Sequence, residues 1–166
     1  HGQPLAIPID YNVIAASELG NISDRRIYLL LKGNDKVPRL LLQNTGLNSG
    51  FMILQYTSAA LVSENKNLCF PASADSITTS LGQEDHVSMG SIAGVKLVEV
   101  VENIKRILSI ELMTAAQAMQ FRRPRKTSPE LELMLSEFRS KVPYIEKDQV
   151  MYTLMQKSEE FISEEL

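Results

Sequence analysis

The segment from Gln83 to Phe121 constrains the fold of this chain more than any other. It contains no proline and little glycine, and apolar side chains recur on nearly every face of the helix that it predicts. At about 1.5 Å per residue, such a helix spans roughly 55–60 Å, nearly twice the diameter of a small domain. A helix that is apolar on most faces must be buried by other helices or by other subunits. The segment therefore predicts an all-α, long-helix bundle and self-association of the chain.

Apolar spacing and helix-end signals predict shorter helices on both sides of this segment. The predicted helices cover residues 4–20, 23–33, about 49–68, 129–141 and 147–163. Gly20 is expected to end the first, Ser23 to cap the second, and Ser128 with Pro129 to begin the fourth. No repeat or low-complexity tract interrupts the pattern. Residues 1–166 are therefore predicted to form a single helical domain.

Composition and charge exclude several classes of function. A net charge of −3 predicts no general affinity for nucleic acid or for an anionic membrane. The sequence has no run of about 18 uncharged apolar residues, so no transmembrane helix is expected. Its one cysteine, Cys69, rules out an internal disulfide and is typical of a reducing cytoplasm, and its apolar neighbours favour buried packing over a nucleophilic role. The chain opens at His1 without an initiator methionine, which suggests a fragment of a longer protein.

No self-sufficient catalytic motif is present. The two histidines, His1 and His86, have no partner at zinc-ligand spacing, so no metal site is predicted. No serine sits in a Gly-x-Ser-x-Gly turn, and the glycine-rich phosphate-binding loops are absent. The basic run "FRRPRK" is interpreted as a solvated helix end rather than a nucleic-acid patch.

One short stretch, "SLGQEDHVSMG", concentrates ionisable side chains just before the apolar segment. Ser80 and Gln83 have the spacing of a capping box, in which side chains satisfy the first free amides of a helix. Glu84 and Asp85 then fall in the first turns, where the helix dipole favours negative charge. This structural interpretation accounts for the acids but not for His86. A functional role for the cluster therefore stays open at this point.

Several motifs together resemble one family. They are "HGQP", "SELGNISDRRI", "GLNSGFMI", "SENK", "PASADSI" and "QEDHVSMG". In combination they resemble the C-terminal third of the histidine ammonia-lyases, a branch of the aromatic amino acid lyase and aminomutase family, and the resemblance covers essentially all 166 residues. It implies a largely helical homotetramer whose active sites take residues from three subunits. Such an assembly explains an apolar helix too large for one small domain.

The resemblance also implies a reaction. Histidine-acting members eliminate ammonia from L-histidine to give urocanate, the first step of histidine degradation. The electrophile is MIO (4-methylideneimidazole-5-one), which forms from an Ala-Ser-Gly tripeptide. This chain contains no Ala-Ser-Gly, so the group is expected to form upstream and the 166 residues alone are expected to be inactive. The alternatives are a tyrosine or phenylalanine lyase or aminomutase of the same family, or a non-catalytic helical assembly module.

Two residues match positions to which the resemblance assigns contact with the substrate. Glu84 matches a glutamate that lines the pocket around the substrate side chain, where phenylalanine-acting members carry an amide. A carboxylate suits the N–H of an imidazole, so Glu84 is the candidate for both substrate binding and catalysis. Met52 falls where phenylalanine-acting relatives often carry lysine and is the second candidate substrate-binding residue, with core packing as its alternative. His1 and Gly2 are expected to border the pocket without acting in it.

Overall fold

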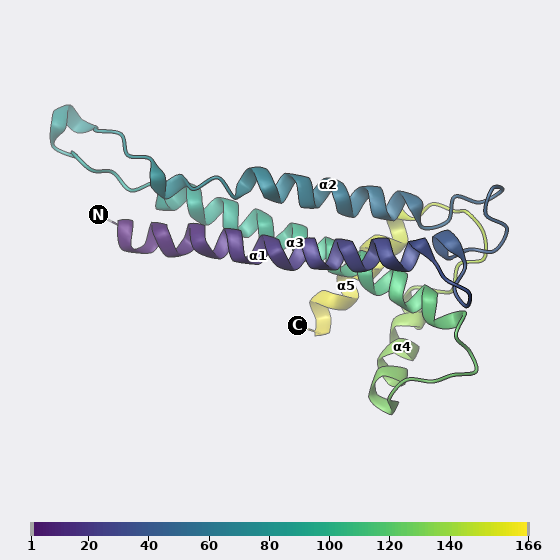
Figure 1. The fold of residues 1–166 in the computed structure, drawn as a ribbon. Helices are drawn as coiled ribbons and strands as arrows, with labels where there is room; N and C mark the ends of the chain where they lie inside the picture. Colours follow the sequence, from purple (N-terminus) through teal and green to yellow (C-terminus); the bar gives the residue numbers. More distant parts are fainter. Residues whose placement is uncertain (1, 166) are drawn as a thin grey trace. The chain divides into compact units, whose positions relative to one another are not determined.

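The computed structural model describes residues 2–165, and these residues form helices without a strand (Figure 1). The helices are α1 (Gln3–Lys32), α2 (Met52–Leu68), α3 (Gly90–Gln120), α4 (Pro129–Lys141) and α5 (Tyr152–Glu165). Three short 3-10 turns lie between them: η1 (Arg39–Leu41), η2 (Ala72–Ala74) and η3 (Ser80–Gly82). The all-α prediction is confirmed. None of the described helices is long and apolar enough to cross a membrane.

One continuous helix, α1, replaces the two that were predicted over residues 4–20 and 23–33. Gly20 is buried inside it rather than ending it. An interior glycine costs a helix roughly 1 kcal/mol relative to alanine, and the burial of the turns on either side outweighs that cost. Ser23 is not an N-cap either, because its buried hydroxyl donates to Oε2 of Glu111 at 2.5 Å.

Two other helix starts differ from the prediction. The long apolar helix, α3, begins at Gly90 instead of Gln83, because the preceding residues form a tight turn with left-handed backbone angles. Helix α5 begins at Tyr152 rather than at residue 147. The residues directly before it form no helix or strand, and one of them, Asp148, binds backbone amides elsewhere in the chain. The predicted cap of α4 is confirmed, since the Ser128 hydroxyl accepts a hydrogen bond from the helix.

The chain divides into two compact units, each built from segments far apart in sequence. The first unit comprises the chain up to Asn21 together with Ala60–Ile104. The second comprises Ile22–Ala59 and the chain from Lys105 onward. Helices α1, α2 and α3 each contribute one part to either unit. The expectation of a single domain stays a prediction.

In the first unit, polar side chains tie the segment after α2 to α1. The buried carboxylate of Asp10 accepts a hydrogen bond from the backbone N–H of Ser73 at 2.6 Å, and the amide of Gln3 donates to the Ser73 carbonyl at 2.9 Å. Burial alone would raise the pKa of the Asp10 carboxyl, but the hydrogen bonds from Ser73 and Ala72 and the nearby charge of Lys96 leave that pKa lowered. The ionised carboxylate is therefore the form that holds this segment.

Cys69 lies in the same unit, at the end of α2. It is a free thiol and only half-buried, and its Sγ lies 3.2 Å from the hydroxyl of Ser17. Its predicted packing role thus holds in part, with polar contacts to Ser17 and to the Val13 carbonyl that the apolar neighbours in the sequence did not indicate.

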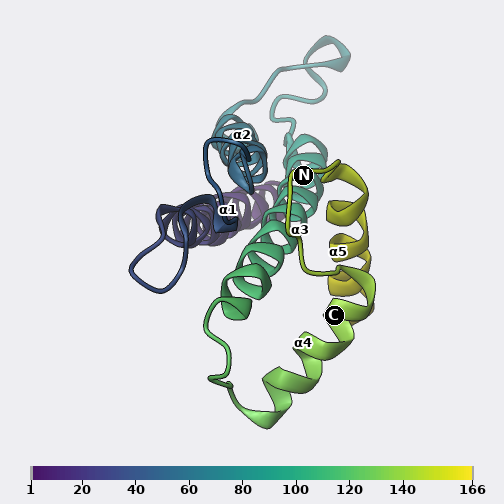
Figure 2. The same ribbon diagram turned by 90° about the vertical axis from the view of Figure 1, so that its right-hand side faces the viewer.

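In the second unit, α4 and α5 lie side by side (Figure 2), and their contact includes the rings of Phe138 and Phe161, edge to face with centroids 5.4 Å apart. Such aromatic pairs add about 0.5–1.5 kcal/mol beyond the area that they bury. Glu111 on α3 accepts hydrogen bonds from Ser23 and Arg26 on α1. A further hydrogen bond, from the Ser158 hydroxyl on α5 to the Ser109 carbonyl on α3 at 2.8 Å, joins the C-terminal helices to this pair.

Gln117 on α3 binds the backbone of two other segments in this core. It is fully buried, and its Nε2 donates to the carbonyls of Leu41 at 3.1 Å and of Ile145 at 2.7 Å. Its Oε1 accepts from the backbone N–H of Ile145 at 3.2 Å. One carboxamide therefore pairs three buried backbone groups from two segments. These groups have no hydrogen-bond partner in a helix or sheet.

Replacing this carboxamide tests its contribution. In Gln117→Ala, three buried backbone groups lose their partner, and each such loss costs about 1–3 kcal/mol, so the free energy of unfolding should fall by at least about 3 kcal/mol. Urea unfolding followed by circular dichroism measures it. Gln120→Ala, an exposed glutamine of the same helix, is the control and should change stability by less than about 0.5 kcal/mol. Equal stability of the two variants would contradict the assignment.

Candidate functional site

Glu84 closes a tight turn in the loop between α2 and α3. The backbone N–H of Thr79 donates to the Glu84 carbonyl at 3.0 Å, and the N–H of Glu84 donates back to the Thr79 carbonyl at 3.3 Å. Ser80, Leu81 and Gly82 between them all have positive φ, at 54°, 57° and 92°. Glycine adopts such angles freely, whereas serine and leucine do so at a cost, so the turn is a strained one. The half-buried Glu84 side chain is placed by this turn.

This geometry corrects the predicted capping box. Ser80 and Gln83 lie in and beside the turn, and helix α3 begins only at Gly90. Glu84 and Asp85 therefore do not sit in the first turn of a helix, and the helix dipole does not explain them. The spacing of Ser80 and Gln83 matched a capping box, but three consecutive residues with positive φ reverse the chain before a helix can begin.

The rest of this loop is closed by side-chain hydrogen bonds. The hydroxyl of Ser76 accepts from the backbone N–H of Val87 at 3.2 Å and lies 3.0 Å from Nδ1 of His86. The hydroxyl of Thr78 donates to the Asp85 carbonyl at 3.3 Å. His86 thus binds a neighbour in its own loop, which the sequence analysis had left without an explanation. Within its unit the loop reaches out past the helix ends (teal in Figure 1).

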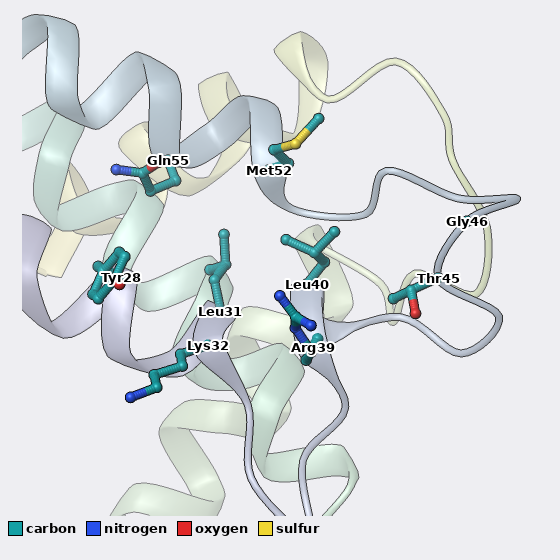
Figure 3. Close-up of a pocket in the computed structure, with 9 residues that line it drawn as sticks. All are labelled: Tyr28, Leu31, Lys32, Arg39, Leu40, Thr45, Gly46, Met52 and Gln55. Carbon is teal, nitrogen blue, oxygen red and sulfur yellow. The ribbon is translucent and has the colours of Figure 1, made fainter.

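Met52 is the first residue of α2 and lines a cavity of about 530 Å³ (Figure 3). Its side chain is half-buried, whereas the neighbouring Phe51 is fully buried in the core. The cavity is lined by Tyr28, Leu31, Lys32, Arg39, Leu40, Thr45, Gly46, Met52 and Gln55. Met52 therefore lies on the wall of this cavity and not in the fully buried core.

Polar groups around this cavity were missed by the sequence analysis. Lys32 ends α1, Arg39 belongs to η1, and Tyr28 and Gln55 lie on α1 and α2 (Figure 3). Only Gln55 shares an element with Met52, three residues further along the same helix face, so spacing could have indicated that one residue. The others come from segments whose approach to Met52 depends on tertiary packing.

Glu84 belongs to the first unit and Met52 to the second, and each is described within its own unit. Among residues 2–165, no group of three or more histidine, cysteine, aspartate or glutamate side chains could hold a metal ion. Gly2 directly precedes α1, and a Cβ at this position would lie 2.8 Å from the Ser88 hydroxyl oxygen. The expectation for His1 lies outside the described residues.

Comparison with known proteins places these features in a family. A family model described as aromatic amino acid lyase matches residues 1–140. The chain belongs to this family. It is 46% identical to histidine ammonia-lyase 1 of Fusobacterium nucleatum over 98% of its own length and 32% of that protein. The crystal structure of histidine ammonia-lyase from Trypanosoma cruzi matches it with a TM-score of 0.95 and 47% identity over 99% of this chain and 33% of the other.

More distant members share the fold. Tyrosine aminomutase from Streptomyces globisporus matches with a TM-score of 0.91 and 32% identity, again over 99% of this chain and 32% of the other. The chain thus spans about a third of the length of the curated relatives that it matches. Its lyase-type all-helical fold is shared by enzymes with different names.

Proposed function

We propose that this chain is part of an ammonia-lyase that converts L-histidine to urocanate and ammonia. The observation that supports it most directly is identity of 46–48% to proteins named histidine ammonia-lyase across 98% of the chain, against 32% to a tyrosine aminomutase. The alternative is a tyrosine- or phenylalanine-acting lyase or aminomutase of the same family, which the lower identity makes second choice. A non-catalytic helical module is the third.

Glu84 is assigned to the imidazole ring of the substrate. The closed turn from Thr79 to Glu84 holds its backbone, and a carboxylate accepts the N–H that an imidazole offers and a phenyl ring does not. A carboxylate that accepts this bond also stabilises positive charge on the ring and can hold a proton during elimination. Glu84 is therefore proposed both as the residue that selects the substrate and as a catalytic group.

The MIO electrophile belongs to another part of the protein in this proposal. Its Ala-Ser-Gly precursor is absent from all 166 residues, and none of the side chains around Glu84 or Met52 supplies an equivalent electrophile. When present, the group withdraws electrons from the substrate amine and so promotes its departure. The residues of this chain contribute recognition of the ring and shape of the pocket.

The proposed whole protein is a cytoplasmic homo-oligomer, a tetramer by analogy with its family. The support is an apolar stripe on the first part of α3, where Val95 and Val98 are 67% and 65% exposed. Such faces in a water-soluble chain are normally covered by a partner. The lone cysteine favours the cytoplasm. L-Histidine is the proposed small-molecule partner, with no nucleic acid and no membrane.

The central test replaces the carboxylate of Glu84. In a full-length lyase that carries these residues, Glu84→Gln should leave the melting temperature nearly unchanged and lower histidine kcat/KM by roughly 10–100-fold, the value of a charge-assisted hydrogen bond. If Glu84 also holds a proton, kcat should fall by about 100-fold or more. Urocanate absorbance gives the rate.

The matched control is Asp85→Asn, the same acid-to-amide change one residue further along an exposed part of the loop. It should keep near-parental kinetics. Normal histidine turnover by Glu84→Gln would remove Glu84 from the site, and a gain of tyrosine or phenylalanine turnover without loss of histidine turnover would favour the alternative function.

Met52 is tested separately. In the same full-length protein Met52→Lys places a cation on the cavity wall beside the ring of the substrate, and like charges in contact cost several kcal/mol, so kcat/KM should fall by about 100-fold or more. Met52→Leu, which conserves volume, should cost less than about 1.5 kcal/mol in stability and leave kinetics close to the parent. Equal turnover by the lysine variant and the parent would return Met52 to core packing.

The contribution of the missing electrophile gives a third test. The 166-residue chain, incubated with L-histidine, should produce no urocanate above a protein-free control, because it contains no Ala-Ser-Gly from which MIO forms. Absorbance of urocanate is again the measurement. Turnover by this chain alone would show that its own residues suffice for elimination.

A further inference from the structure

Asp148 joins the C-terminal segment to the turn that precedes Met52. Its two carboxylate oxygens accept hydrogen bonds from the backbone N–H groups of Ser49 at 2.7 Å and Gly50 at 2.8 Å. Its own backbone N–H donates to Oδ1 of Asn48 at 3.1 Å. Three consecutive residues are thus held by one residue about a hundred positions further along the chain. Hydrogen bonds to an ionised acceptor are roughly twice as strong as neutral ones.

The turn of residues 48–50, which Asp148 binds on one side, is closely packed against Leu40 on the other. Gly50 has φ +58°, and a Cβ there would lie 2.3 Å from the carbonyl oxygen of Leu40. That same oxygen accepts from the N–H of Phe51 at 3.0 Å, and Phe51 is fully buried. The turn therefore contacts Leu40 of η1 on one side and the carboxylate of Asp148 on the other.

The segment that carries Asp148 is itself held by the core of the same unit. Ile145, three residues before Asp148, is buried and accepts and donates hydrogen bonds to the side chain of Gln117. The exposed Asp148 carboxylate therefore lies on a segment that hydrogen bonds hold against α3. Its negative charge also faces the N-terminal end of α2, where the helix dipole favours an anion.

The position of Met52 depends directly on the position of this turn. The N–H of Met52 donates to the carbonyl of Ser49 at 3.3 Å, and Met52 follows Gly50 by two residues. A shift of the Ser49–Gly50 amides therefore moves the first turn of α2 and with it the thioether on the cavity wall.

We propose that Asp148 is a positioning residue that sets where Met52 meets the substrate, acting through the Ser49 and Gly50 amides. The inference rests on the proposed function, in which Met52 contacts the substrate. Asp148 lies beyond residues 1–140, the part that the family model matches. It is not among the residues that line the cavity, and its hydrogen bonds described above join it to residues 48–50, so its effect on the reaction is transmitted by the backbone of that turn.

The test uses a full-length lyase that carries these residues. Asp148→Ala should lower histidine kcat/KM by about 10-fold, mostly through KM, because misplacing a binding group by a fraction of an ångström to 1 Å costs up to about 100-fold. Asp148→Asn keeps one carbonyl oxygen for one of the two amides and should recover part of the loss. Lys147→Ala, on the same exposed segment, is the control and should behave as the parent. Asp148→Asn also serves as the test variant if Asp148→Ala does not fold.

A double-mutant cycle with Met52→Ala separates positioning from general stability. If Asp148 acts through Met52, the KM effect of Asp148→Ala should largely disappear once Met52 is alanine. Hydrogen exchange at the Ser49 and Gly50 amides should speed up in Asp148→Ala and not in Lys147→Ala.

The outcomes distinguish this inference from the proposed function. Additive effects of the two substitutions, or unchanged exchange at both amides, would overturn the role of Asp148 and leave Met52 in the site. A Met52→Ala variant with parental histidine kinetics would overturn the Met52 assignment itself and this inference with it.

Discussion

The buried carboxamide of Gln117 is the interaction on which the second unit depends. Two irregular segments, around Leu41 and around Ile145, run against α3 and bury backbone groups that no helix or sheet can pair. Gln117 pairs three of them with one side chain. Helix α3 thus offers these segments both an apolar surface and specific hydrogen bonds, so they adopt defined paths. The cavity beside Met52 and the turn before it exist because those paths are fixed.

The sequence predicted which residues are helical better than it predicted where helices begin. Apolar spacing identified α2, α3 and α4 because burial of one face decides them locally. Gly20 misled the prediction because tertiary burial outweighs a cost of about 1 kcal/mol. Ser80 and Gln83 misled it because the same spacing fits a cap or a tight turn, and only the left-handed angles of Ser80 and Leu81 distinguish the two.

The candidate site shows the same division between local and distant causes. Glu84 and Met52 were found because short motifs around them resemble those of a family, and neither would stand out by composition or periodicity. Tyr28, Lys32 and Arg39 could not be found in this way, since their approach to Met52 results from the packing of α1 and η1. Asp148 was invisible for a similar reason: an aspartate in a polar segment predicts an exposed helix, not a clamp on residues about a hundred positions earlier.

The two candidate residues differ in how far along the chain their supports lie. The hydrogen bonds that close the loop around Glu84, from Ser76 to Val87 and from Thr79 to Glu84, join residues no more than eleven positions apart. The turn before Met52 is held by Asp148, about a hundred positions away. The Glu84 loop is therefore a self-contained cassette that could be exchanged between relatives as one contiguous piece. The cavity wall that carries Met52 could be transplanted only together with Asp148, so these two segments are open to change by different genetic routes.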